Sequence, residues 1–166
     1  MPDGDITIKI EGVGDVINAL EAMKARLDVA TRAATVKSGQ TLQSKAVGNF
    51  EGTHAPGMPH QGGSKPNTVT GNLQRSIIAW PVVRQGIARY SVQINPTAIY
   101  SRIIELGGTI TPKEKRYLSW ISDTGKRVYR KQVTLRGWPY LAPATRDTAA
   151  VMNNIFESYW SGALHG

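Results

Sequence analysis

The sequence contains no cysteine, no long hydrophobic run and only 12 acidic residues, and each of these absences narrows the possible functions. Without cysteine there is no disulfide and no thiolate ligand for a metal, which is compatible with assembly in a reducing cytoplasm. No segment approaches the roughly 18 apolar residues of a transmembrane helix. Residues 1–10 lack the basic and apolar regions of a signal peptide. We therefore expect neither a signal peptide nor a membrane span, and no membrane partner.

The usual signatures of catalysis are also missing. No serine lies in a nucleophile elbow, and there is no P-loop and no Gly-x-Gly-x-x-Gly after a strand. The few carboxylates form no closely spaced pair suited to acid–base work. His54 and His60 lie in one loop without a third ligand nearby, so we predict no metal and no cofactor. We expect a protein that is not an enzyme, with an enzyme of unrecognised type as an open alternative.

What the chain does contain is the composition of an ordinary globular protein. Hydrophobic residues make up 40% and charged residues 19% of the 166 residues, which is enough to build one core. Two domains would leave each half small. We therefore predict a single domain over residues 1–166.

Positive charge is concentrated in one segment. Residues 113–136 hold eight bases and two acids, which accounts for most of the formal net charge of +8. Such a segment attracts an anionic partner, either nucleic acid or an acidic protein face, although a solvated hairpin without a partner is a plain alternative. Aromatic residues near these bases are core residues, interface residues or stacking platforms for single-stranded nucleic acid. They are Tyr117, Trp120, Tyr129, Trp138 and Tyr140.

The N-terminal third is predicted to be mostly helical. Alternating isoleucines indicate a short strand over 5–10. From Asp15, a plausible N-cap, apolar residues recur at spacings of three and four, which predicts a long amphipathic helix to about Phe50. Gly39 is a weak point within it. Glycines and prolines then predict a long flexible loop over 51–69.

The rest of the chain alternates hairpins with helices, which favours an α+β fold in which the N-terminal and C-terminal helices pack on an antiparallel sheet of hairpins. Thr70 begins a short capped helix, and Pro81 restricts its strand to a sheet edge or a bulge. The further elements are a hairpin over 77–83 and 88–94, a helix over 98–106, a basic hairpin over 117–121 and 127–135 within 113–136, and a last helix over 144–161.

Four short segments stand out by their residues and their order. They are Thr70-Gly71-Asn72-Leu73-Gln74-Arg75-Ser76-Ile77; Tyr100 with Ile104-Glu105-Leu106-Gly107; Ile110-Thr111-Pro112-Lys113 with Leu118-Ser119-Trp120 and Val133-Thr134-Leu135; and Trp138-Pro139-Tyr140-Leu141-Ala142-Pro143-Ala144. In this order, together with the long N-terminal helix, they resemble the small head–tail joining, neck and tail-completion proteins of long-tailed bacteriophages, and the resemblance extends over about residues 16–156. One difference is that Trp138 stands where that family has an arginine, while Arg136 lies two residues earlier.

The resemblance implies a structural virion protein. Such proteins form six- or twelve-fold homo-oligomeric rings between the connector or head-completion proteins and the tail tube or tail terminator, with genomic DNA passing through non-specifically. The resemblance thus implies a place in the virion neck or tail after assembly in the host cytoplasm. A tail terminator or another tail subunit is the alternative, and a free basic nucleic-acid-binding protein is a third hypothesis.

Particular residues are expected to carry these roles. Exposed bases and aromatic anchors are the expected contacts with partner rings. They are Lys126, Arg127, Arg130, Lys131, Arg136, Trp138 and Tyr140. Four further residues are expected to be structural: Glu105, Gly107, Pro139 and Pro143. Because Glu105 lies in an apolar helix end, we predict that it forms an ion pair with an arginine rather than acting in catalysis.

Overall fold

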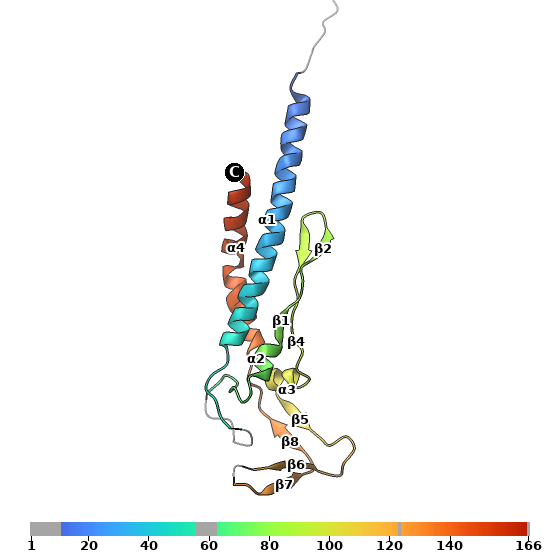
Figure 1. Ribbon diagram of the computed structural model, residues 1–166, viewed down its shortest axis with the longest axis vertical. Coiled ribbons are helices and arrows are strands. Elements are labelled where there is room, and N and C mark those ends of the chain that lie inside the picture. The colour runs from blue at the N-terminus through green and yellow to red at the C-terminus, as the bar shows by residue number, and fades with distance from the viewer. Residues whose placement is uncertain (1–10, 56–62, 123, 166) are drawn as a thin grey trace, which may run out of the picture.

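The computed structural model describes residues 11–55, 63–122 and 124–165 of an elongated molecule. Two antiparallel helices run along its long axis, and short strands line one side and the lower end (Figure 1). The α+β class predicted from the sequence is confirmed. The antiparallel strands, however, form four separate two-stranded ladders rather than one continuous sheet. The strand predicted over 5–10 lies outside the described residues.

Helix α1 spans Val13–Gly48 and is 36 residues long. At about 1.5 Å per residue it extends roughly 54 Å. The predicted N-cap was wrong, because the helix begins two residues earlier than expected. Gly12, with φ 84°, occupies the cap position. Asp15 lies in the first turn, where its negative charge interacts favourably with the positive end of the helix dipole.

Helix α4 spans Leu141–His165 and packs antiparallel against α1. Two contacts set the register of the pair. The Lys45 ammonium donates to the carbonyl oxygen of Asp147 at 2.6 Å near the lower end. The Trp160 indole N–H donates to Thr31 Oγ1 at 3.0 Å near the upper end. Since α4 is the shorter helix, α1 continues well beyond its C-terminus (Figure 1).

The first predicted hairpin is present but interrupted. Strand β1 (Ile77–Ala79) pairs with β4 (Ile94–Pro96), and β2 (Val83–Gly86) pairs with β3 (Arg89–Ser91). The break falls around Pro81, which has no N–H to donate to a ladder. The break between β3 and β4 lies on α1 beside Gly39, where a Cβ atom would come within 2.7 Å of a Val92 methyl carbon. Gly39 therefore lets the chain between the two ladders approach the helix closely.

The second half of the chain differs from expectation in its strands, because β5 was not predicted and one predicted strand is divided. Helix α2 (Asn72–Ser76) and helix α3 (Ser101–Leu106) are present as short elements. The predicted strand over 127–135 is two strands, because β7 (Arg127–Arg130) pairs with β6 (Leu118–Ile121) whereas β8 (Val133–Leu135) pairs with β5 (Gly108–Ile110). The bend between β7 and β8 separates the basic hairpin from the body.

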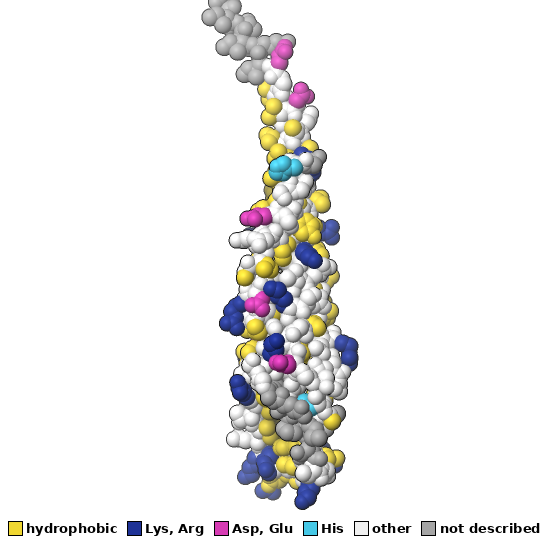
Figure 2. Space-filling model, turned by 90° about the vertical axis from the view of Figure 1, so that its left-hand side faces the viewer, with side chains coloured by type: hydrophobic (Ala, Val, Ile, Leu, Met, Phe, Trp, Pro, Cys, Tyr) yellow, Lys and Arg dark blue, Asp and Glu magenta, His cyan; other side chains and the backbone are white. Residues whose placement is uncertain are grey.

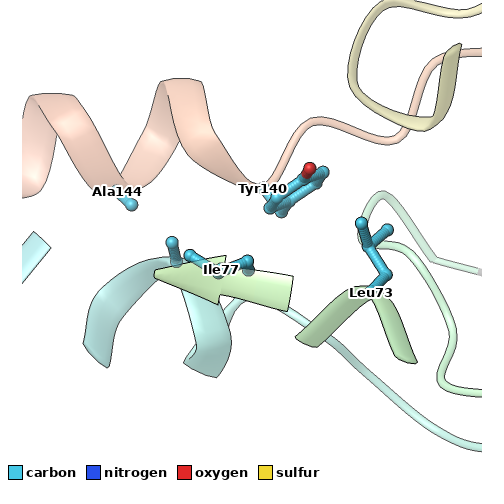
Figure 3. Packing of buried hydrophobic residues seen from close by; sticks show 5 residues of the cluster. Leu73, Ile77, Tyr140 and Ala144 are labelled. Carbon is cyan, nitrogen blue, oxygen red and sulfur yellow. The ribbon is translucent and has the colours of Figure 1, made fainter. Parts of the chain in front are cut away.

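The core lies where the C-terminal half of α1 meets the start of α4. Leu73 from α2 and Ile77 from β1 pack beneath Tyr140 and Ala144 (Figure 3). Ala46 completes the cluster from α1. The Asn49 side chain donates to the carbonyl oxygen of Tyr140 at 2.9 Å, which joins the end of α1 to the start of α4. The segment predicted as a loop is tied at its described ends by a parallel bridge between Thr53 and Thr68.

Candidate functional site

The basic hairpin, β6–β7, is held by its own turn. The Ser122 N–H donates to the Lys126 carbonyl at 2.8 Å, and the Gly125 N–H donates to the Ser122 carbonyl at 3.0 Å. Gly125 has φ 74°, a conformation that side-chain-bearing residues rarely adopt. This geometry fixes the register Trp120↔Val128 and Ile121↔Arg127 along the strands.

Both faces of the basic hairpin combine cations with apolar side chains. On one face Ile121 and Tyr129 are each more than half exposed, beside Arg127. On the other face Trp120 is more than a third exposed, beside Arg130. Among the described elements, β6 and β7 pack mainly on each other. Because an isolated two-stranded ribbon is marginally stable in water, these faces are suited to being covered by another surface.

The bases expected to contact partners are placed as a contact surface requires. The side chains of Lys126, Arg127, Arg130 and Lys131 are exposed on or next to the hairpin, and Arg136 is exposed after β8. The lower end of the molecule, where the hairpin lies, carries a group of lysine and arginine side chains (Figure 2). The structure therefore brings four of these five bases together at one end.

Glu105 performs a structural task that the sequence did not reveal. Its carboxylate accepts hydrogen bonds from the backbone N–H groups of Tyr140 at 2.7 Å, Leu141 at 2.9 Å and Ala142 at 2.9 Å. These N–H groups belong to the first turn of α4 and its preceding residue, which have no intrahelical acceptor. The predicted arginine partner was therefore wrong, because backbone donors at a helix N-terminus satisfy this charge.

Two glycines let this contact form. A Cβ atom on Gly107, where φ is 72°, would lie 2.5 Å from the Gly137 nitrogen, and one on Gly137 would lie 2.8 Å from the Leu106 carbonyl carbon. The Trp138 N–H donates to the Ile104 carbonyl oxygen at 2.7 Å across the same crossing. We call this crossing the α4 junction.

The two prolines expected to be structural lie on either side of the helix start at the α4 junction. Pro139 precedes Tyr140, and Pro143 lies in the first turn of α4. Because Pro143 has no N–H, the first turn of α4 has one donor fewer that needs an acceptor. Three of the four segments that carry the phage resemblance therefore meet at the α4 junction and the core beside it.

Tyr140 is not a partner contact, which corrects the expectation from the sequence. Its side chain is 0% exposed and packs against Phe50 with ring centroids 5.1 Å apart. Burial, with the nearby charge of Glu105, raises the pKa of Tyr140 to about 12. Trp138 is half-buried and borders a largely apolar cavity of about 390 Å³ with Leu73 and Tyr100. The aromatic residues after β8 thus belong to the body rather than to the hairpin surface.

A second surface was not singled out from the sequence. The apolar spacing predicted a stripe along the helix, and the apolar side chains on the N-terminal turns of α1 are between 51% and 59% exposed. We call them the α1 ridge: Val13, Val16, Ile17 and Leu20. The signal was available in the predicted lengths, because a last helix over 144–161 is too short to cover a first helix from Asp15 to Phe50.

Asp28 anchors the first hairpin to α1 and was also not singled out. Its carboxylate accepts from the Tyr90 hydroxyl at 2.7 Å and from the Ala88 N–H at 3.2 Å, and it lies 3.4 Å from an Arg84 guanidinium nitrogen. The hydrogen bond to Asp28 raises the pKa of Tyr90. This cluster fixes the upper end of the hairpin beside α1 and points to no chemistry.

The described part of the chain contains neither a metal-binding cluster nor a membrane-spanning helix. Within residues 11–55, 63–122 and 124–165 no group of three histidine or acidic side chains could hold a metal ion. His60 lies outside these ranges. None of the described helices is long and apolar enough to cross a membrane. Comparison of the chain with protein-family models, curated proteins and solved structures finds no match.

Proposed function

We propose that this chain is a structural virion protein that forms a ring at the head–tail interface of a tailed bacteriophage, with DNA passing through the ring. The observation that supports it most is a long subunit with uncovered apolar surface at both ends, the α1 ridge above and the basic hairpin below. Surfaces of this kind are typical of subunits whose partners are other proteins. The order of the four sequence segments, which resembles that of phage head–tail proteins, favours this particular assembly.

The basic hairpin is the proposed contact with the neighbouring ring. Its cations and exposed aromatic side chains suit an acidic protein surface, because charge guides the encounter and a desolvated aromatic residue holds it. A ring repeats this contact in every subunit, so that modest individual contacts add up to strong binding between rings. The α4 junction has the complementary task of fixing where β8 leaves the body and so where the hairpin lies.

Charge reversal of the hairpin tests the proposal. A phage carrying Arg127→Glu, Arg130→Glu and Lys131→Glu is expected to accumulate unjoined heads and tails, while the purified variant keeps the helical circular dichroism of the wild type. The control reverses three exposed bases elsewhere, Lys37, Arg89 and Arg146, and should leave joining intact. Infectious particles at normal titre from the hairpin variant would refute the proposed contact.

Cryo-electron microscopy of intact virions tests the position directly. A closed ring of this chain between connector and tail tube is expected, and its neighbours separate a neck protein from a tail terminator. Absence of the chain from the particle would overturn the proposed function.

The basic segment also supports a second candidate, a free nucleic-acid-binding protein. That function predicts that the isolated subunit binds DNA tightly and that the binding constant falls steeply with salt, by a logarithmic slope of about 0.9 per neutralised phosphate. Weak, salt-insensitive retention of DNA would argue against it.

A further inference from the structure

The α1 ridge is the continuation of a face that is buried lower down the same helix. Its positions share one side of α1 with Leu27 and Ala34, where α4 packs. The face thus changes from covered to uncovered where α4 ends, and its uncovered part carries the larger side chains. A ridge of large aliphatic side chains along about two turns of helix is suited to another protein surface.

A matching surface lies on the other side of the same helix. Ala25, Val29 and Ala33 of α1 and Tyr159 and Ala163 of α4 line an open, almost wholly apolar groove of about 480 Å³. Val29 on its wall is 69% exposed. At 100° per residue, these α1 positions are centred about half a turn around the helix from the ridge. The ridge of one molecule therefore cannot fill its own groove.

We propose that the α1 ridge of one copy docks into the α1–α4 groove of the next copy. Large side chains meet a groove with a floor of alanines, as in the packing of helix ridges into grooves. Charge agrees with this pairing, because residues 11–23 contain three acids and no base, whereas Arg26 borders the groove. The inference rests on the proposed function, because the contact supplies the association between copies that the proposed ring requires.

The geometry makes the contact heterologous. Ridge and groove are different surfaces on opposite sides of α1, so each copy offers one of each and the contact repeats from copy to copy until a ring closes. The exposed ridge segment, residues 13–23, is only about 16 Å long. It covers less than the roughly 800 Å² per partner of a standard interface, so a single contact is weak and closure of the ring strengthens it.

Two surface variants of the full chain test the pairing. The ridge variant is Val16→Glu with Leu20→Glu, and the groove variant is Ala25→Glu with Val29→Glu; all four positions are exposed, so the fold is retained. The control is Val83→Glu with Ile99→Glu, two exposed apolar residues elsewhere. In sedimentation experiments the wild type and the control are expected to associate, and each of the two variants is expected to be monomeric.

Mixing the variants gives the decisive result. The ridge variant keeps an intact groove and the groove variant keeps an intact ridge, so an equimolar mixture should form 1:1 dimers and nothing larger. Because this dimer has only one contact, the mixture is measured at its highest soluble concentration, and a mixture that stays monomeric there overturns the proposal. A groove variant that associates like the wild type would show ridge-to-ridge pairing instead. A wild type that remains monomeric at its highest soluble concentration also overturns the contact.

The absence of native cysteine allows an independent test. A chain with Leu20→Cys and Val29→Cys, treated with a short bismaleimide, should give a ladder of covalent multiples, and neither single variant should give any. Dimers from Leu20→Cys alone would contradict the heterologous contact. If virions contain the ring but no ladder forms, the contact is wrong and the proposed function stands. If the ladder forms and virions lack the chain, the contact stands and the proposed function falls.

Discussion

Replacing Glu105 with alanine should be among the most destabilising single changes at a partly exposed position of this chain. The substitution removes an anionic acceptor shared by the N–H groups of Tyr140, Leu141 and Ala142. It leaves the part-buried N–H groups of Tyr140 and Leu141 without their acceptor. It also removes a negative charge from the positive end of a 25-residue helix.

The magnitude follows from the number and kind of the lost contacts. Loss of a helix cap costs about 1–2 kcal/mol, and hydrogen bonds to a charged group contribute about 1.5–3 kcal/mol each. The three bonds share one carboxylate and are not additive, so we expect a loss of about 3 kcal/mol in the free energy of unfolding. At about 2–4 °C per kcal/mol for a chain of this size, Tm should fall by roughly 6–12 °C.

Urea unfolding followed by circular dichroism measures this loss. Glu105→Gln keeps one carbonyl oxygen but not the charge, so it should fall about midway between wild type and Glu105→Ala. Glu157→Ala, on the exposed surface of the same helix, is the matched control and should change stability by less than about 0.5 kcal/mol. A Glu105→Ala variant as stable as this control would refute the role assigned to the carboxylate.

Two further predictions concern the α4 junction. Gly107→Ala should lower the free energy of unfolding by about 2–4 kcal/mol, because a Cβ atom there would lie 2.5 Å from a backbone atom. The control is Gly125→Ala, which has a similar positive φ but open space around it and should cost only about 1–2 kcal/mol in urea unfolding. Equal losses for the two variants would refute the crowding argument. Because the folded pKa of Tyr140 is raised to about 12, its contribution to stability is complete below pH 10 and is lost as pH rises toward 12. Tyr140→Phe should therefore flatten the fall of stability between pH 10 and 12, and an unchanged slope would contradict this.

Three of the four segments that carry the phage resemblance have a physical explanation in the structure. Leu73 and Ile77 of the first segment lie in the core, and Tyr140 and Ala144 of the last segment pack over them (Figure 3). Glu105 and Gly107 of the second segment form the α4 junction. The segments therefore record the requirements of one architecture, while the surfaces proposed to contact partners lie largely outside them.

The sequence by itself determined the features that depend on residues close together in the chain. Apolar spacing predicted the two long helices, a glycine turn predicted the basic hairpin, and a count of charges located the basic segment. Each of these signals is contained within a short stretch of chain, because helix and hairpin preferences act over a few residues.

Only the tertiary structure decided which of those surfaces are covered. Glu105 finds its donors 35 to 37 residues away, and Tyr140 is buried by residues from three other elements. The α1 ridge continues the helical spacing of the buried face below it but lies beyond the end of α4. An apolar stripe specifies that a helix face favours burial, but its partner depends on where distant segments end, and that is settled only when the chain packs.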